Sequence, residues 1–156
     1  MPIETWELLS YVVTVVGLPL AICVFLYEQR KERENEEEEV YQLLSDNYQD
    51  FLKVALENPD LRLFSSGNGA DLGPEQRERK LIIFNMLVSL FERAYLVLYD
   101  DAMSPKETRR WRSWEDYMRE WCARRDFRAS LDELLRGEDP AFVSYIRTLA
   151  EEEGGA

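Results

Sequence analysis

A single uncharged run near the start of the chain constrains the fold most strongly. It extends from Leu8 to Tyr27, and none of its twenty residues is charged. A helix rises 1.5 Å per residue, so the run would span about 30 Å, the thickness of a bilayer's hydrocarbon core. Trp6, Tyr11 and Tyr27 lie near its two ends, where aromatic rings favour the membrane interface. The sequence therefore predicts a transmembrane helix over residues 8–27.

The residues on either side of this run predict that the segment is not cleaved and which way it crosses the membrane. A cleaved signal peptide begins with basic residues, whereas residues 1–7 carry two acids and no Lys or Arg. Three bases, Arg30, Lys31 and Arg33, follow the run at the opposite membrane interface. Because positive flanks stay inside, we expect residues 1–7 to form a short non-cytoplasmic tail and the C-terminal part to be cytoplasmic.

One face of the predicted span carries small side chains. Ser10, Thr14, Gly17 and Ala21 recur at spacings of four, three and four, so they share a helix face. Small residues let membrane helices approach closely, and the stripe predicts a self-association seam. In a ring of copies the same stripe would line a pore. Small residues are also common in membrane helices that have neither role.

The rest of the chain predicts only helices. Residues 28–39 are charged and favour helix, which predicts a juxtamembrane stalk that continues from the span. Residues 40–150 repeat apolar side chains at helical spacing without any alternating strand pattern, so we expect a compact cytoplasmic bundle of four to five helices. Residues 151–156 are expected to fray. The predicted class is all-α: one transmembrane helix, a stalk and a helical bundle.

Local signals predict where the helices of the bundle begin and end. Asn58-Pro59 should end the first helix, and Pro74 should open the next one after a glycine-rich loop. Ser104-Pro-Lys-Glu has the form of a capping box. Asp126 and Asp139 are predicted to cap the last two helices.

The apolar stretch from Leu81 to Tyr99 has two interpretations. It is either the central helix of the bundle or a second membrane span. Glu92 and Arg93 near its middle would each cost about 2.5–3.5 kcal/mol in a bilayer. We therefore favour a central helix, in which Glu92 and Arg93 form an ion pair.

The residues needed for common enzyme chemistry are missing. The chain has no histidine, so it lacks the usual triad base and the commonest metal ligand. Cys23 lies in the predicted span and Cys122 in the bundle, which gives no disulfide framework and no metal motif. These observations predict a non-enzymatic protein without a cofactor or metal. A net charge of −12 disfavours nucleic acid as a partner.

One segment of this acidic chain is basic. Lys106–Arg128 has eight bases and five acids, and Arg124, Arg125 and Arg128 cluster at its end. Arginines beside tryptophans could bind a nucleotide or another anion. The favoured alternative is a helix surface with ion pairs between residues four apart and the tryptophans buried. The expected pairs are Arg112 with Asp116, Glu115 with Arg119, and Glu120 with Arg124.

The order of features resembles a group of bacterial membrane proteins with one N-terminal anchor and a helical cytoplasmic domain, to which no activity is assigned. The resemblance covers nearly the whole chain and is strongest at Phe91–Tyr95 and Trp114–Trp121. It implies a single-pass protein of the bacterial inner membrane. We expect a membrane-anchored interaction or regulatory module with an unknown protein partner, acting as a homo-oligomer. The alternative is an oligomeric effector or pore gated by a nucleotide or another anion.

Overall fold

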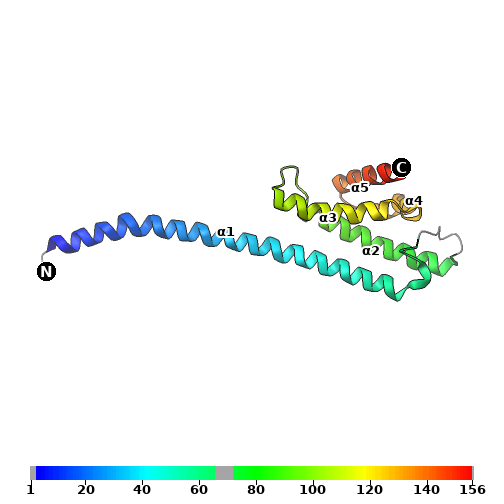
Figure 1. Cartoon of the computed structure of the whole chain (residues 1–156), viewed down its shortest axis with the longest axis horizontal. Coiled ribbons are helices and arrows are strands. Elements are labelled where there is room, and N and C mark those ends of the chain that lie inside the picture. Colours follow the sequence, from blue (N-terminus) through cyan, green and yellow to red (C-terminus); the bar gives the residue numbers. More distant parts are fainter. Residues whose placement is uncertain (1–2, 66–71, 156) are drawn as a thin grey trace. The chain divides into compact units, whose positions relative to one another are not determined.

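The computed structural model describes the backbone of residues 3–65 and 72–155, and the side chains from residue 15 onward within those ranges. All regular structure in this part of the chain is helical, which confirms the all-α class (Figure 1). The five α-helices and one 3-10 turn are α1 (Ile3–Glu57), η1 (Pro59–Leu61), α2 (Pro74–Leu98), α3 (Pro105–Cys122), α4 (Arg125–Leu134) and α5 (Pro140–Gly154).

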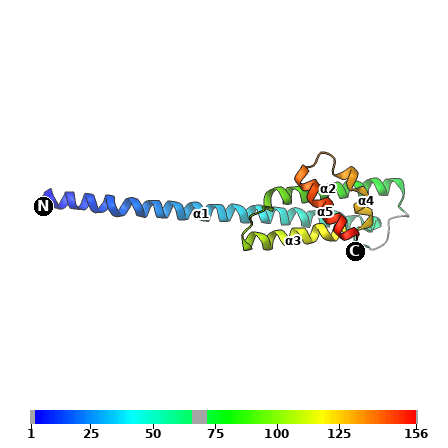
Figure 2. The ribbon, with the colours of Figure 1, turned by 90° about the horizontal axis from the view of Figure 1, so that it is seen from above.

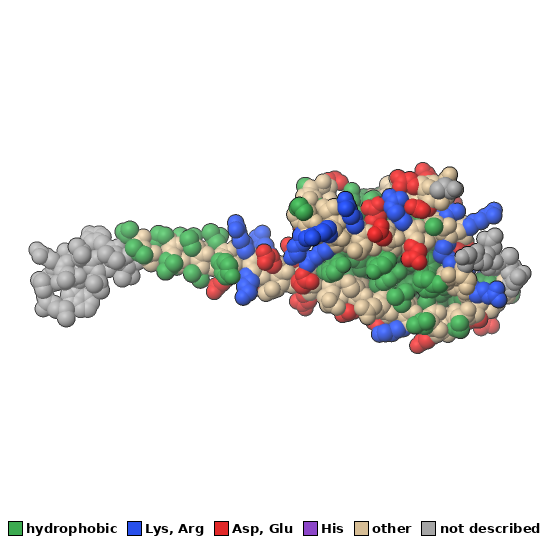
Figure 3. Space-filling model, in the orientation of Figure 1, with side chains coloured by type: hydrophobic (Ala, Val, Ile, Leu, Met, Phe, Trp, Pro, Cys, Tyr) green, Lys and Arg blue, Asp and Glu red, His purple; other side chains and the backbone are tan. Residues whose placement is uncertain are grey.

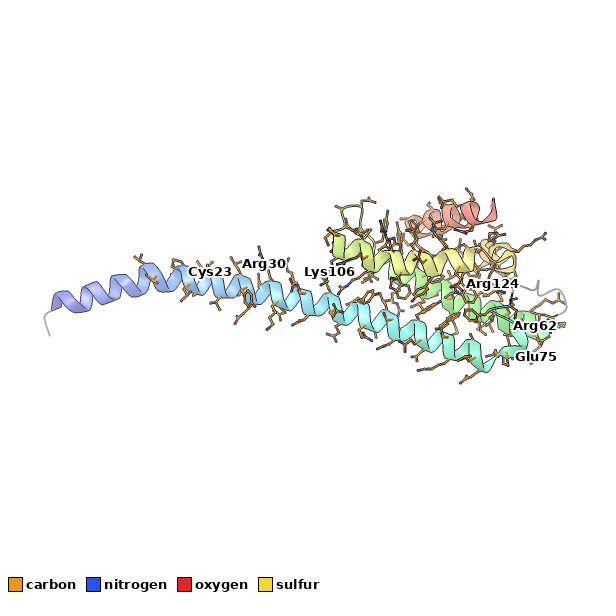
Figure 4. The ribbon with its side chains drawn as sticks, in the orientation of Figure 1. Cys23, Arg30, Arg62, Glu75, Lys106 and Arg124 are labelled. Atoms are coloured by element: carbon orange, nitrogen blue, oxygen red, sulfur yellow. The ribbon has the colours of Figure 1, made fainter. Side chains whose placement is uncertain are left out.

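The chain divides into two units, residues 1–43 and 44–156. In the first unit the large apolar side chains of α1 between Val15 and Tyr27 are all at least 49% exposed. Figure 3 shows hydrophobic side chains on the surface of this helix, followed by Lys and Arg side chains. Exposed bases follow at positions 30, 31 and 33. Gly17 and Ala21 of the predicted seam lie on this helix, and Cys23 is exposed (Figure 4). The side chains of Trp6, Ser10, Tyr11 and Thr14 lie outside the described residues.

The second unit is a helical bundle around an aromatic core. The helix α5 packs against α3, and α2 packs against α3, α4 and α5 (Figures 1 and 2). Trp121 lies at the centre of the core, where its ring meets rings from four other segments. The centroids of Phe51, Phe64, Phe84 and Phe127 lie 5.5, 5.2, 5.9 and 6.1 Å from that of Trp121. Aromatic residues of α3 therefore join α1, α2 and α4.

Most of the predicted helix boundaries are confirmed. α1 ends just before Asn58-Pro59, and Pro74 is the first residue of α2. The capping box forms at α3, where Glu107 N donates to Ser104 Oγ (3.4 Å) and Ser104 N donates to Glu107 Oε2 (2.6 Å). Asp139 Oδ1 accepts from the amides of residues 141 and 142 at the start of α5.

Two predicted ends differ from the structure. The cap of α4 is Arg124 rather than Asp126, whose carboxylate instead binds cationic side chains. The fraying expected over residues 151–156 does not begin at Glu151, because α5 continues to Gly154. Arg119 of α3 holds this last turn through Glu152 (2.8 Å) and Glu153 (3.1 Å).

Candidate interaction surface

Two of the three arginines predicted to bind an anion, Arg124 and Arg128, already have partners within the chain. Arg124 pairs with Asp126, with 2.9 Å between Nη2 and Oδ2, and its Nη1 donates to the Ser65 carbonyl oxygen (3.1 Å). Its guanidinium also lies 5.7 Å from the ring centroid of Trp121. Figure 4 shows Arg124 at the same end of the bundle as Arg62. An anion at Arg124 would therefore compete with a carboxylate already in place.

The other two predicted arginines do not complete a cluster. Arg128 turns inward, and its Nη1 donates to the carbonyl oxygen of Cys122 (2.5 Å). Arg125 is exposed and forms no ion pair with any residue that the structure describes. The three guanidinium groups thus have three different surroundings, and an anion site among them stays a prediction.

Asp126 is the centre of a largely buried ion triad. Besides Arg124, it accepts a hydrogen bond from Lys80 of α2, whose side chain is only 8% exposed. Burial alone would raise the pKa of Asp126, but hydrogen bonds from Lys80 and Arg124 outweigh burial and lower it. The triad fastens α2 to the junction of α3 and α4. Its role is structural, and sequence reasoning missed it because Lys80 is forty-six residues away from Asp126.

One of the three ion pairs predicted on α3 is present. Arg119 Nη2 lies 2.8 Å from Glu115 Oε1, and the carboxylates around Arg119 raise its pKa. The predicted pair of Glu120 with Arg124 is wrong, because Arg124 turns to Asp126. The predicted pair of Arg112 with Asp116 is also absent from the ion pairs among described residues.

Glu92 and Arg93 do not form the predicted ion pair, because they lie on different faces of α2. Glu92 Oε1 accepts from the backbone N–H of Asp139 (2.5 Å), which fastens α2 to the start of α5. Arg93 is exposed on another face. Glu138 hydrogen-bonds to Glu92, and this bond, burial and the neighbouring charge raise the pKa of Glu138 to about 7.

The Glu92–Glu138 contact predicts a pH dependence of stability. A raised pKa means that the folded chain binds the proton more tightly than the unfolded chain, whose ordinary value is 4.5. The resulting stabilisation is present at low pH and is lost as the pH rises through about 7. Between pH 5 and 8 we expect the free energy of unfolding to fall by about 1 kcal/mol relative to Glu138→Gln, after allowance for solvent screening.

Urea unfolding at several pH values in mild detergent, followed by far-UV circular dichroism, measures this difference. The exposed Glu133→Gln exchange is the matched control and should keep the wild-type slope. Identical slopes for the wild type and Glu138→Gln would rule out this role for the carboxyl pair. Asp126 does not interfere, because its lowered pKa places its titration below 3.8.

The remaining candidate chemical groups are the two cysteines and the acidic side chains. Cys122 is a buried free thiol, and burial raises its pKa to about 12, which suppresses the thiolate. Within residues 15–65 and 72–155, no three Cys, Asp or Glu side chains are grouped as metal ligands. Cys23 is likewise a free cysteine.

The most distinctive surface lies on α2. This helix is long and apolar enough to cross a membrane, yet only 39% of its most apolar window is buried in the bundle. One side of α2 forms the core, whereas large apolar side chains such as Ile82 (55% exposed) and Leu96 (56%) lie on the other. The residues exposed on this second side are Ile82, Asn85, Met86, Ser89, Arg93, Leu96 and Val97.

A groove runs along this exposed side between α2 and the last turns of α1. Its volume is about 470 Å³, and its lining mixes apolar and polar side chains. Asp50 in its wall is paired with Lys53 (2.8 Å), whereas Arg93 forms no ion pair with a described residue. The lining residues are Asn47, Asp50, Phe51, Val54, Ile82, Asn85, Met86, Ser89, Leu90 and Arg93.

No protein-family model matches this chain, and no similar protein was found among curated proteins or solved structures. The resemblance to bacterial single-pass membrane proteins therefore stays a prediction. The features of the chain that bear on function are the exposed apolar segment of α1 and the groove between α1 and α2.

Proposed function

We propose that this chain is a non-enzymatic, membrane-anchored interaction module that works as a homo-oligomer at the cytoplasmic face of a bacterial inner membrane. The observation that carries the proposal is the uncovered side of α2, where a mixed groove adjoins exposed apolar side chains. Monomeric soluble proteins rarely expose large contiguous apolar patches, and larger ones mark interaction sites. A wide groove without assembled catalytic groups suits binding better than chemistry.

The first unit supports the membrane anchor. Between Val15 and Tyr27 every large apolar side chain is at least 49% exposed, an arrangement that lipid would stabilise and water would not. The exposed bases Arg30, Lys31 and Arg33 then favour a cytoplasmic C-terminal part. The stripe Ser10, Thr14, Gly17 and Ala21 is the proposed contact between spans.

Membrane fractionation tests the anchor directly. Full-length chain expressed in bacteria should stay in the membrane pellet after an alkaline wash. Leu18→Arg with Leu20→Arg should release much of it, because each arginine costs about 2.5–3.5 kcal/mol in a bilayer. Leu56→Arg, at a bundle position that is 79% exposed, is the matched control and should fractionate like the wild type. Release of the wild-type chain by the wash would contradict the anchor.

A further inference from the structure

We propose that the uncovered side of α2 binds the same surface of a second copy of this chain, with the two α2 helices antiparallel. The inference rests on the proposed function and deepens it, because it names the surface through which the copies meet. It concerns the cytoplasmic bundle and is independent of the small-residue seam in the predicted span.

Six exposed residues of α2 form one continuous stripe. From the first turn onward they recur at steps of three or four residues, so they lie on a single face of the helix. The stripe is acidic at its N-terminal end, apolar and weakly polar in the middle, and basic toward its C-terminal end. Its successive members are Glu75, Glu78, Ile82, Met86, Ser89 and Arg93.

The charges on this stripe select the antiparallel arrangement. Glu78 and Arg93 are fifteen residues apart, about 22 Å along the helix. Around a two-fold axis near Asn85, Arg93 of each copy faces the Glu75 and Glu78 end of the other. A parallel pair would instead place Arg93 against Arg93, which is repulsive. None of these three charged side chains forms an ion pair with a described residue of its own chain.

The apolar middle of the stripe and the groove supply the rest of the contact. In the antiparallel pair Ile82 of one copy lies near Met86 of the other, and both side chains are about half exposed in the single chain. The groove beside them, about 470 Å³ in volume and walled by Val54 of α1, has room for side chains of the second copy. Two α1–α2 pairs then form a symmetric four-helix contact.

Disulfide cross-linking in native membranes tests this arrangement. The full-length chain would carry Cys23→Ser, which leaves only the buried Cys122, and a new cysteine on the stripe. Asn85→Cys lies at the proposed axis and should cross-link to its own copy under mild oxidation. Leu96→Cys lies on the same face but would be about 33 Å from its counterpart, so it should stay monomeric. Equal cross-linking at both positions would indicate parallel helices and overturn the proposal.

Charge reversal supplies an independent readout. Arg93→Glu should slow the cross-linking of Asn85→Cys at least about tenfold, because acids would then face acids. Adding Glu75→Arg and Glu78→Arg should restore the rate, a rescue that simple loss of folding would not show. A rate unchanged by Arg93→Glu, or no rescue, would overturn the proposed pairing.

The outcomes separate this inference from the proposed function. If Asn85→Cys fails to cross-link while the full-length chain is oligomeric by native mass, this surface is wrong and the homo-oligomer stands. If a label at Met86 is quenched by nitroxide lipids instead, the face contacts the bilayer and the pairing is overturned. A monomeric wild-type chain contradicts both.

Discussion

Replacing Asp126 with alanine is expected to lower the free energy of unfolding by about 3–5 kcal/mol, because it leaves buried cations without their counter-ion. Lys80 and Arg124 both donate to this carboxylate, and the Lys80 side chain is 8% exposed. The loss would be measured by urea unfolding in mild detergent at pH 7, followed by the far-UV circular dichroism of the helices.

A control and a double substitution make this test specific. Asp132 pairs with Arg147 at 2.9 Å but is 86% exposed, so Asp132→Ala should change the free energy of unfolding by less than about 1 kcal/mol. In a Lys80→Met background the cost of Asp126→Ala should shrink, since one orphaned charge is then gone. If Asp126→Ala and Asp132→Ala lowered the free energy of unfolding equally, the buried triad would stabilise the fold no more than an exposed ion pair does.

Replacing Trp121 with alanine is expected to lower the free energy of unfolding by about 3–5 kcal/mol, because the core loses packing. Trp121 is 1% exposed, and the centroid of its ring lies within 6.1 Å of the centroids of four other aromatic rings. Removing it would leave a cavity where α1, α2, α3 and α4 converge. The same unfolding experiment measures the effect.

Two further variants test this packing account. Trp121→Phe keeps an aromatic ring in the core and loses less volume, so it should cost much less than Trp121→Ala. Leu56→Ala, at a position that is 79% exposed, should stay within about 0.5 kcal/mol of the wild type. A small effect of Trp121→Ala would contradict the central place of this ring.

Local chemistry made the class and most helix ends predictable. Proline at the first helical position and the serine–glutamate capping box act within four residues, so Pro74 and Ser104 identify their helices without tertiary information. The tryptophans of α3 recur at helical spacing, and Trp111, Trp114 and Trp121 are buried as expected. These signals need only the neighbouring sequence.

The partners of charged side chains could not be predicted in the same way. Glu120 lies four residues before Arg124, yet Arg124 binds Asp126, because the chain bends at the end of α3 and brings that carboxylate closer. Glu92 similarly accepts a hydrogen bond from the backbone N–H of Asp139 and does not pair with its neighbour Arg93. Which partner a charged side chain binds depends on which helices pack together, and the spacing of residues in the sequence does not show this.

The exposed side of α2 could not be predicted from the sequence for a related reason. The stretch from Leu81 to Tyr99 is apolar nearly all round, so its pattern could not distinguish the side that packs from the side that stays exposed. Only the positions of α1, α3, α4 and α5 reveal that Ile82 and Leu96 are left uncovered. The small-residue stripe of the predicted span, by contrast, rests on spacing alone and stays a prediction.

The central claim is that anchored copies of this chain associate, and the native mass of the full-length protein in mild detergent or nanodiscs tests it most directly. We predict a defined oligomer that persists on dilution, with an even number of copies if the α2 surface is two-fold. A single-copy mass at every protein concentration would contradict the account.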